Sequence, residues 1–354
     1  MSAARPDLMR DRIQDHYATF RGILSLYLTN QCNLTCDHCG TGSGPKMKTA
    51  LAINSDLEAQ IRRAIQSGGI KAIHLSGGEP FLRRRDLMTL STLAQEEHVP
   101  LAVNTNGYWA LTVARGEAAL NALPGLSHII LSTDVYHARE LPIERVADAA
   151  QAALLCERQV DICTVTPFAQ EDEFTLKLDA LLRARGLLDR VNRVMTVLEK
   201  ADRPVPLDEA LLAPWVTGPD PRPCMLVNRP TVLENRAVLA CCNTPIASQV
   251  AQGPLILGHV NQTPLDQILS HDKIDPVIQA LRVAGPAFLA SLLGQEGEHL
   301  LQAPYRQGDI CGICVAVMGD PERVKRVRAQ LADHPHSRAI AMAFELTTGR
   351  PQLP

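Results

Sequence analysis

The sequence predicts an α/β fold, a parallel sheet with helices outside it, followed by a small α+β domain. Two observations lead to this prediction. Strand-like apolar runs alternate with amphipathic helical segments over the first 200 residues or so, and the pattern then changes to short β-rich runs with cysteines. A length of 354 residues suits two domains. With 46% hydrophobic and 21% charged residues, the composition permits a sizeable core.

Six runs carry the strand pattern and five segments between them carry the helical one. The candidate strands are Ile23–Thr29, Lys71–Ser76, Pro100–Thr105, Ser127–Ser132, Gln159–Thr166 and Val191–Leu198. The candidate helices are Asp56–Ser67, Asp86–Glu97, Leu111–Leu120, Ile143–Glu157 and Glu173–Arg185. Such repeats imply a parallel sheet, but this pattern alone does not distinguish an open sheet from a barrel.

Charge and cysteine content narrow the functional class. The formal net charge of −3 gives no overall field that would attract nucleic acid or an anionic membrane. The N-terminus lacks the apolar segment of a signal peptide, and no apolar run approaches the length of a membrane span. Ten cysteines in such a chain favour metal or redox chemistry over disulfides. We therefore expect a cytoplasmic protein with no nucleic-acid or membrane partner.

Three cysteines follow the first candidate strand. Cys32, Cys36 and Cys39 have the spacing C-x3-C-x2-C, which lets one loop fold its thiolates around an iron–sulfur cluster. Three protein ligands leave one iron of a [4Fe–4S] cluster open to a small molecule. A zinc site is the alternative. Zinc needs a fourth ligand, and His38 is poorly placed to supply it because it directly precedes Cys39.

A second motif, Gly77-Gly78-Glu79-Pro80, ends the second candidate strand. Together with the cysteines and His38, it resembles the radical S-adenosylmethionine (SAM) superfamily. The resemblance implies a partial (β/α)6 barrel of the TIM type that binds SAM at the open iron. It also implies that the two glycines approach the methionine moiety and that Glu79 helps to bind its amino group. The alternative for this motif is an ordinary turn at the end of a strand.

Other polar residues end strands of the predicted barrel, where the chemistry of such barrels lies. Asn104 and Asn106 end the third strand, and Ser132 and Asp134 end the fourth. In similar enzymes these ends contact the ribose, the methionine carboxylate or the substrate. Asn106 can instead belong to a turn, and Ser132 to the start of a helix. Cys163, on the fifth strand, is a candidate hydrogen donor to a substrate radical or else a small buried side chain.

Composition divides the chain into five parts. We expect an N-terminal arm at 1–22, the barrel at 23–200, a proline-rich linker at 201–223, an auxiliary domain at 224–320 and a helical tail at 321–354. The auxiliary domain is predicted to begin with a β-hairpin, formed by Met225–Glu234 and Arg236–Cys241, that turns at Glu234-Asn235.

Four more cysteines predict a second metal centre. They are Cys224, one of Cys241 and Cys242, and the pair Cys311 and Cys314. Four thiolates suit a closed [4Fe–4S] cluster, and the order of elements resembles the twitch domain, a one-cluster relative of the SPASM domain. Asn235 or Arg236 stands where that family usually has glycine. A structural zinc site is the alternative, and the choice between Cys241 and Cys242 stays open because neighbouring strand residues face opposite ways.

The resemblance implies reductive cleavage of SAM to a 5′-deoxyadenosyl radical, which removes hydrogen from a substrate C–H bond. By analogy with twitch and SPASM enzymes, the leading hypothesis is maturation of a ribosomally synthesised peptide by cross-linking, oxidation or epimerisation. One alternative is a dehydrogenase or epimerase of a sugar or aminocyclitol. The other is a binding protein stapled by zinc.

Two partner proteins follow from this hypothesis. The cluster needs an electron donor of the flavodoxin or ferredoxin type. The basic run Arg83–Arg85 is either a solvated helix start or a docking patch for such an acidic donor. The arm at 1–22 is too short to bind a leader peptide, so we expect a separate leader-peptide-binding protein.

Overall fold

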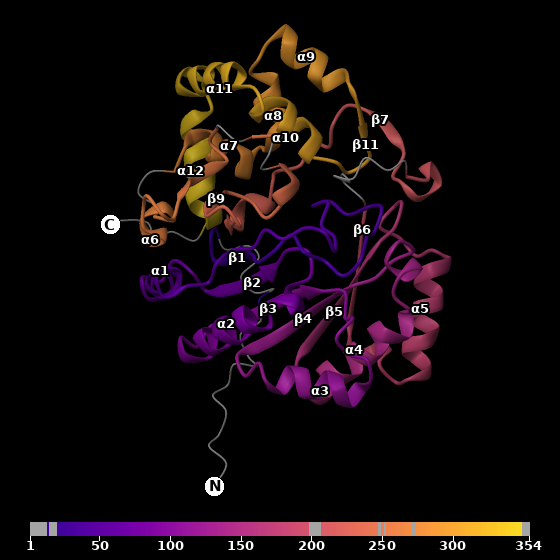
Figure 1. Ribbon diagram of the computed structural model, residues 1–354. Coiled ribbons are helices and arrows are strands. Elements are labelled where there is room, and N and C mark those ends of the chain that lie inside the picture. The colour runs from indigo at the N-terminus through magenta and orange to yellow at the C-terminus, as the bar shows by residue number, and fades with distance from the viewer. Residues whose placement is uncertain are drawn as a thin grey trace.

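The computed structural model describes residues 13, 20–197, 207–246, 249–250, 253–270 and 274–348. The predicted α/β fold is confirmed. Six parallel strands pair in chain order and form the partial TIM-type barrel in the lower half of Figure 1. They are β1 (Ile23–Tyr27), β2 (Ala72–Ser76), β3 (Leu101–Thr105), β4 (Leu126–Ser132), β5 (Gln159–Val165) and β6 (Asn192–Thr196).

Helices cover the outer face of this sheet. They are α1 (Ser55–Gln66), α2 (Arg84–Glu96), α3 (Val113–Asn121), α4 (Ile143–Leu155) and α5 (Glu173–Ala184). Alternate strand residues point to opposite faces. Leu24 and Leu26 of β1 therefore join the core that includes Leu57 and Ile61 of α1. All five helices start and end within three residues of their predicted bounds, because apolar periodicity is strong throughout this half.

The inward-facing side chains form a small apolar floor. Ile23, Ala72, Ala102 and Ile130 contribute one residue from each of β1 to β4. Ile13, from the N-terminal segment, packs among them and is only 2% exposed. This end of the barrel interior thus combines hydrocarbon with the buried pair of His128 and Asp161, whose Nε2 and Oδ2 lie 3.2 Å apart.

The barrel sheet continues into the C-terminal half. β8 (Thr231–Val232) pairs in parallel with β1, and β9 (Ala237–Leu239) and β10 (Ile256–His259) extend the sheet by antiparallel pairing. The amide of Ser25 donates a hydrogen bond to the carbonyl of Pro230 at 2.8 Å. One nine-stranded sheet therefore joins the two halves of the molecule.

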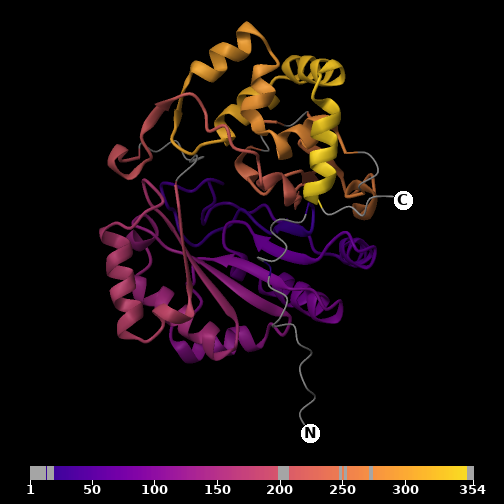
Figure 2. The ribbon, with the colours of Figure 1, turned by 180° about the vertical axis from the view of Figure 1, so that it is seen from behind.

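Helices enclose a second core beside this extension, in the orange and yellow region of Figures 1 and 2. They are α6 (Leu265–Ile268), α7 (Pro276–Val283), α8 (Gly285–Ser291), α9 (Gln295–Gln302), α10 (Cys311–Met318), α11 (Pro321–Asp333) and α12 (Ser337–Thr348). Val327 of α11 and Phe344 of α12 lie in this core, and the Phe344 ring meets Phe20 edge to face at 4.8 Å.

Three expectations about this half need correction. The predicted linker contains a strand, β7 (Trp215–Thr217), which pairs with β11 (Pro304–Arg306). Residues 321–348 do not form a separate tail, since α11 and α12 pack into the second core. The first arm of the hairpin is shorter than predicted, because Leu226–Asn228 form a turn of 3-10 helix. Most of the predicted N-terminal arm, and residues 198–206, lie outside the described residues.

Among the described residues, no helix combines the length and the apolar character that a membrane span requires.

Candidate functional site

The three cysteines lie in a long loop that leaves β1 and closes back on itself. The Leu51 amide donates to the Leu28 carbonyl at 2.9 Å, and the Asn30 amide donates to the Thr49 carbonyl at 3.1 Å. Farther out, the Cys32 amide donates to the Gly44 carbonyl at 3.2 Å. These backbone bonds fix the base of the loop beside the carboxyl end of β1.

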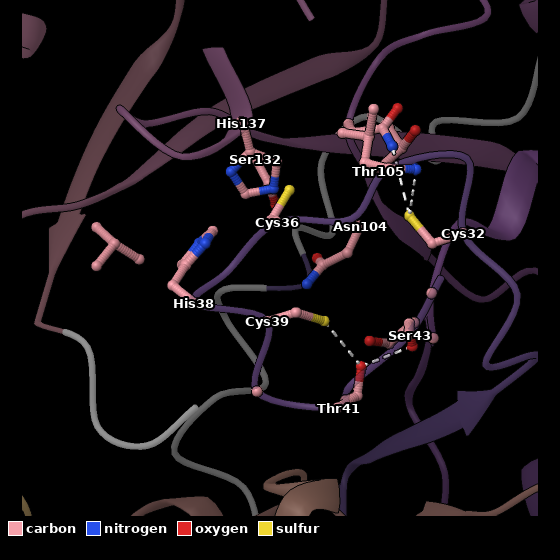
Figure 3. Close-up of a pocket in the computed structure, with 17 residues that line it drawn as sticks. Cys32, Cys36, His38, Cys39, Thr41, Ser43, Asn104, Thr105, Ser132 and His137 are labelled. Atoms are coloured by element: carbon pink, nitrogen blue, oxygen red, sulfur yellow. Dashed lines mark hydrogen bonds between the residues drawn. The ribbon is translucent and has the colours of Figure 1, made fainter. Parts of the chain in front are cut away.

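The loop forms one wall of a pocket of about 300 Å³ at the carboxyl ends of the strands (Figure 3). Barrel residues form the rest of its lining. Of the residues predicted from the sequence, the pocket is lined by Cys32, Cys36, His38, Cys39, Gly77, Gly78, Asn104, Asn106 and Ser132. The structure thus brings together both motifs and the two strand ends that follow them.

The chemistry of the three thiols fits an iron–sulfur cluster. Leu34 N–H and Asn106 Nδ2 donate hydrogen bonds to Cys32 Sγ at 3.4 and 3.8 Å, and Cys39 Sγ lies 3.5 Å from the Thr41 hydroxyl. Burial raises the pKa of Cys32 to about 11 and raises that of Cys36 further. These thiols therefore stay protonated until a cationic metal group replaces their protons. Hydrogen bonds to sulfur are one way in which a protein tunes a cluster's potential.

Gly77 and Gly78 are required by the chain itself. A Cβ on Gly77, whose φ is +144°, would lie 2.5 Å from the Thr29 carbonyl oxygen, and one on Gly78 would lie 2.2 Å from the Gln31 carbonyl oxygen. The Gly78 amide donates to the Thr29 carbonyl at 2.6 Å. Their lack of side chains thus lets the end of β2 hold the base of the cysteine loop.

Glu79 does not line the pocket, and it is fully buried. Its carboxylate accepts hydrogen bonds from the Phe81 amide at 2.9 Å, the Thr105 hydroxyl at 2.8 Å and the Asn106 amide at 2.9 Å. Burial raises the pKa of Glu79 to about 7, although these bonds act in the opposite direction. The carboxylate holds the end of β3, and its contact with an ammonium group stays a prediction. Pro80 is buried at the start of the 3-10 helix η2 (Pro80–Arg83).

A polar chain that sequence reasoning missed orients Asn104. His74 Nε2 lies 3.0 Å from Asn104 Oδ1, and His74 Nδ1 lies 3.3 Å from the Ser25 hydroxyl. Burial lowers the pKa of His74 to about 4, so the ring is neutral. The amide oxygen of Asn104 accepts the Nε2 proton, which leaves its NH2 group available to the pocket. The inward alternation Ser25, His74, Asn104 was the signal available in the sequence.

Asp134 lies beneath the pocket wall and binds two histidines. Its Oδ2 is 3.1 Å from His38 Nε2 and 2.9 Å from His137 Nδ1, and its Oδ1 accepts the amides of Tyr136 and His137. Burial acts to raise the pKa of Asp134, but His137 and the contacts with both rings hold it well below its usual range. The His38 ring stacks on Tyr136 with centroids 4.4 Å apart.

Two surface contacts strengthen this attachment of the cysteine loop. Glu140 Oε1 accepts the amide and the hydroxyl of Thr35 at 2.7 and 3.0 Å, and Arg139 pairs with Asp37 at 2.8 Å. The segment after β4 thus clamps the loop from outside. Sequence reasoning missed Tyr136, His137, Arg139 and Glu140 in this role, because their partners lie about 100 residues earlier in the chain.

Cys163 pairs with Ser132 of β4, which lines the pocket, but it is not itself in the lining. It packs against the apolar floor of the barrel, and burial raises its thiol pKa to about 12. The pocket lining instead includes Val165, two residues farther along β5. The role of Cys163 as a hydrogen donor stays a prediction.

The second group of cysteines meets in the C-terminal half. Cys224, Cys241, Cys311 and Cys314 line one small cavity, and Cys242 is not in its lining. Asn243 Nδ2 donates to Cys311 Sγ at 3.0 Å, and Asp309 caps the helix that carries Cys311 and Cys314. The free volume, about 10 Å³, admits a group the size of one water. No three of these four sulfurs lie close enough together to hold one metal ion as they stand, and a cluster requires the sulfurs to move apart.

A larger cavity, of about 600 Å³, lies beyond the ends of β5 and β6. Pro167–Gln170 and Met195–Val197 form its barrel side, while Asp220, Arg222 and Gln307 approach from the C-terminal half. Arg222 Nε pairs with Asp220 at 2.7 Å. Val165 lines the cysteine pocket and Pro167 lines this cavity, so the two spaces meet the same strand end.

Comparison with known proteins agrees with this geometry. Residues 26–141 match the family model of the radical SAM superfamily. A GTP 3′,8-cyclase of Paenarthrobacter nicotinovorans is 32% identical over 143 residues, which are 39% of this chain and 38% of that protein. YydG of Bacillus subtilis (strain 168), named for peptide biosynthesis, is 27% identical over 117 residues, or 32% of this chain and 36% of its own length. The chain thus spans little more than a third of these two relatives.

Among solved structures, BtrN in complex with AdoMet and 2-DOIA aligns with 81% of this chain and 94% of its own, at 15% identity and a TM-score of 0.47. Members of the matched family bind SAM and a [4Fe–4S] cluster, which are therefore the cofactors of this chain. The pocket that collects the C-x3-C-x2-C cysteines lies within the matched residues and the strands beside them. Residues 26–141 of the chain therefore carry a radical SAM domain.

Proposed function

We propose that this radical SAM enzyme matures a ribosomally synthesised peptide by cross-linking, oxidising or epimerising one of its residues. The observation that carries the proposal is the arrangement of two spaces at one end of the barrel. The cysteine pocket and the cavity of about 600 Å³ both border the end of β5, the first at Val165 and the second at Pro167. Cluster and SAM, when bound, supply the 5′-deoxyadenosyl radical that removes a hydrogen atom from the substrate.

The chain's own residues then have distinct roles. Cys32, Cys36 and Cys39 are the proposed cluster ligands, and Asn106 fixes Cys32 by its hydrogen bond. The NH2 group of Asn104, oriented by His74, is suited to bind a carboxylate or hydroxyl oxygen of SAM. The Ser132 hydroxyl at the end of β4 is suited to the same kind of contact. Because carbon-centred radicals are reactive, the walls of the pocket also serve to exclude competing reactions.

Several features of the larger cavity support a peptide substrate. It combines apolar side chains, including the 56% exposed Phe168, with polar ones such as Gln170 and the Asp220–Arg222 pair. A peptide presents both kinds of group, through its side chains and its backbone. The similarity to YydG, whose name assigns it to peptide biosynthesis, points in the same direction.

A small-molecule substrate is the second candidate. GTP 3′,8-cyclases, whose name specifies a small-molecule substrate, are similar to 39% and 57% of this chain at 32% and 28% identity. The volume of the cavity also lies within the range of about 300 to 1,000 Å³ that small-ligand sites occupy. A dehydrogenase or epimerase acting on a sugar or aminocyclitol would use the same cysteine pocket with a different partner in the cavity.

An auxiliary [4Fe–4S] cluster and two partner proteins complete the proposal. The ligands of the auxiliary cluster would be Cys224, Cys241, Cys311 and Cys314. In an overall oxidation, this cluster would accept an electron from the substrate radical. A flavodoxin or ferredoxin would supply electrons for SAM cleavage. A separate protein would bind the leader of the peptide.

The test uses anaerobically reconstituted protein with SAM, a strong reductant and a size-fractionated extract of the native cell. Formation of 5′-deoxyadenosine is measured, with Cys39→Ala as the inactive control. If the peptide fraction stimulates the reaction and protease treatment removes that effect, peptide maturation is supported. Stimulation by the small-molecule fraction would transfer the proposal to the second candidate. Absence of 5′-deoxyadenosine from iron-loaded protein would contradict both candidates.

A further inference from the structure

Three side chains around the cysteine pocket form a group of possible metal ligands. Two of them, His38 and His137, are not proposed as cluster ligands. Cys36 and His38 come from the cysteine loop, and His137 comes from the turn η3 (His137–Arg139) after β4. Each offers one ligand atom, and these three atoms lie within 4.8 Å of one another. Figure 3 shows the three side chains gathered on one side of the pocket, with Cys32 and Cys39 on other sides. One ion could contact all three after a small inward shift of these side chains, since ligand atoms on one zinc lie at most about 4.4 Å apart.

The surroundings of His38 indicate a missing ligand. The side chain is 7% exposed, its Nε2 lies 3.1 Å from Asp134 Oδ2, and its other nitrogen, Nδ1, is buried without a hydrogen-bond partner. A buried nitrogen in this state costs free energy until something binds it. A proton on Nε2 facing Asp134 leaves Nδ1 with the lone pair that a metal requires.

Asp134 has the position of an outer-shell carboxylate. It contacts the rings of both His38 and His137, and it is itself fixed by the amides of Tyr136 and His137. In metal sites, a carboxylate behind a ligating histidine sets the tautomer and orientation of the ring. One buried carboxylate that contacts two histidines provides this for both at once, and its negative charge favours a cation nearby.

We propose that Cys36, His38 and His137 form a mononuclear Zn²⁺ site in the protein that lacks its cluster. One sulfur and two imidazole nitrogens are ligands that zinc prefers, and a fourth position remains open to water. Among the other first-row metals, Fe²⁺ binds such ligands more weakly than Zn²⁺.

The proposed site and the cluster exclude each other, because both use Cys36. Zinc bound here would occupy one cluster ligand and hold the loop in its folded position. Cluster assembly would then require its removal. This inference is independent of the substrate, and it holds whether or not the protein matures a peptide.

The test titrates Co²⁺, a spectroscopic substitute for Zn²⁺, into the full-length protein without its clusters. Wild type, Cys36→Ala, His137→Ala and Cys39→Ala are compared. All four keep the C-terminal cysteines, so that site contributes equally to each. We expect wild type and Cys39→Ala to take up one ion, with sulfur-to-cobalt absorption, that Cys36→Ala and His137→Ala do not. Asp134→Asn should weaken this uptake by about 10- to 100-fold, as loss of an outer-shell partner does.

The same variants also define the outcome that would overturn the proposal. If His137→Ala keeps the extra ion and Cys39→Ala loses it, the three cysteines are the ligands and the proposal is overturned. Circular dichroism of each variant checks that a lost signal is not a lost fold. As a second measurement, added Zn²⁺ should slow cluster reconstitution in wild type, followed by absorption and by electron paramagnetic resonance. The same slowing in His137→Ala would count against the site.

Discussion

Glu79 shows how a single buried carboxyl group can organise the backbone and side chains around a site. Its carboxylate accepts hydrogen bonds from Phe81, Thr105 and Asn106, and Asn106 in turn donates to Cys32. Burial nevertheless raises the pKa of Glu79 to about 7, because the charged form is removed from water. The residue therefore links the stability of the protein to pH and positions a partner of the cysteine loop.

Replacing Glu79 by Gln should change how stability depends on pH. In the unfolded chain the carboxyl ionises near its ordinary value of 4.5, while in the folded protein it keeps its proton until about pH 7. Between these values the folded state binds the extra proton, so the free energy of unfolding falls as pH rises, by at most about 3 kcal/mol. Urea unfolding of wild type and Glu79→Gln on both sides of this window checks the effect. Parallel curves for the two proteins would refute it.

The two neighbouring cysteines at the end of β9 should differ in their effect on metal content. Cys241 lines the second cavity and Cys242 does not. Under the proposed auxiliary cluster, Cys241→Ser should lower the iron of reconstituted protein from about eight to about four atoms per chain, and Cys242→Ser should leave it unchanged. Iron, sulfide and zinc analysis provides the measurement. Zinc in place of the second set of iron atoms would favour the structural zinc site.

At the scale of elements, the end of β2 and the start of the cysteine loop depend on close contact of two backbones. The Gly78 and Glu79 amides donate to the carbonyls of Thr29 and Gln31. Side chains at Gly77 and Gly78 would separate these segments. The strand that carries the second motif therefore also holds the first one in place.

Gly78→Ala should destabilise the protein and reduce cluster loading together. Its Cβ would lie 2.2 Å from the Gln31 carbonyl oxygen, and overpacking of this kind costs about 1–3 kcal/mol or more. Gly69→Ala, on the loop that precedes the same strand, is the matched control. Its Cβ would come no closer than 3.6 Å to any neighbour, so the change should stay within about 0.5 kcal/mol. Thermal unfolding and iron content are measured for both variants to test this difference. Equal behaviour would contradict the contact argument.

At the scale of the whole molecule, the two halves share hydrogen bonds as well as a chain. β8 pairs with β1, and β1 leads directly to Cys32. The Thr231 hydroxyl donates to the Cys241 carbonyl at 3.0 Å, which ties the same strand to the second group of cysteines. A change at one metal centre can thus reach the other through two strands.

We therefore expect loss of the C-terminal metal to loosen β1. In Cys314→Ser, amide hydrogens of residues 23–32 should exchange with deuterium faster than in the loaded wild type, because the β8 pairing that protects one edge of β1 is weakened. Hydrogen-exchange mass spectrometry measures this directly. Cys156→Ser, at the end of α4 and away from both groups, is the control and should leave β1 unchanged. Unaltered exchange in Cys314→Ser would show that the halves are not coupled in this way.

The sequence predicted elements well and contacts between distant elements poorly. All six barrel strands begin and end within two residues of their predicted bounds, since apolar periodicity and turn residues are local signals. The attachment of Thr35 to Glu140 spans 105 residues and leaves no local trace. Nor did residue type identify the left-handed position of the hairpin. Arg236, at φ +70°, occupies it instead of the more tolerant Asn235, because its guanidinium binds the Ala52 carbonyl and Asn261.

The apolar floor of the barrel, which includes Ile13, has a consequence for water. Among the described residues, this floor covers one side of the polar chain Ser25, His74 and Asn104, and the cysteine pocket, which Asn104 lines, lies on the other. In the described part of the chain, the barrel interior then opens to solvent at the cysteine pocket. A substrate bound over the cysteine pocket would cover this opening. The molecule that reacts would then also exclude water while the reaction proceeds.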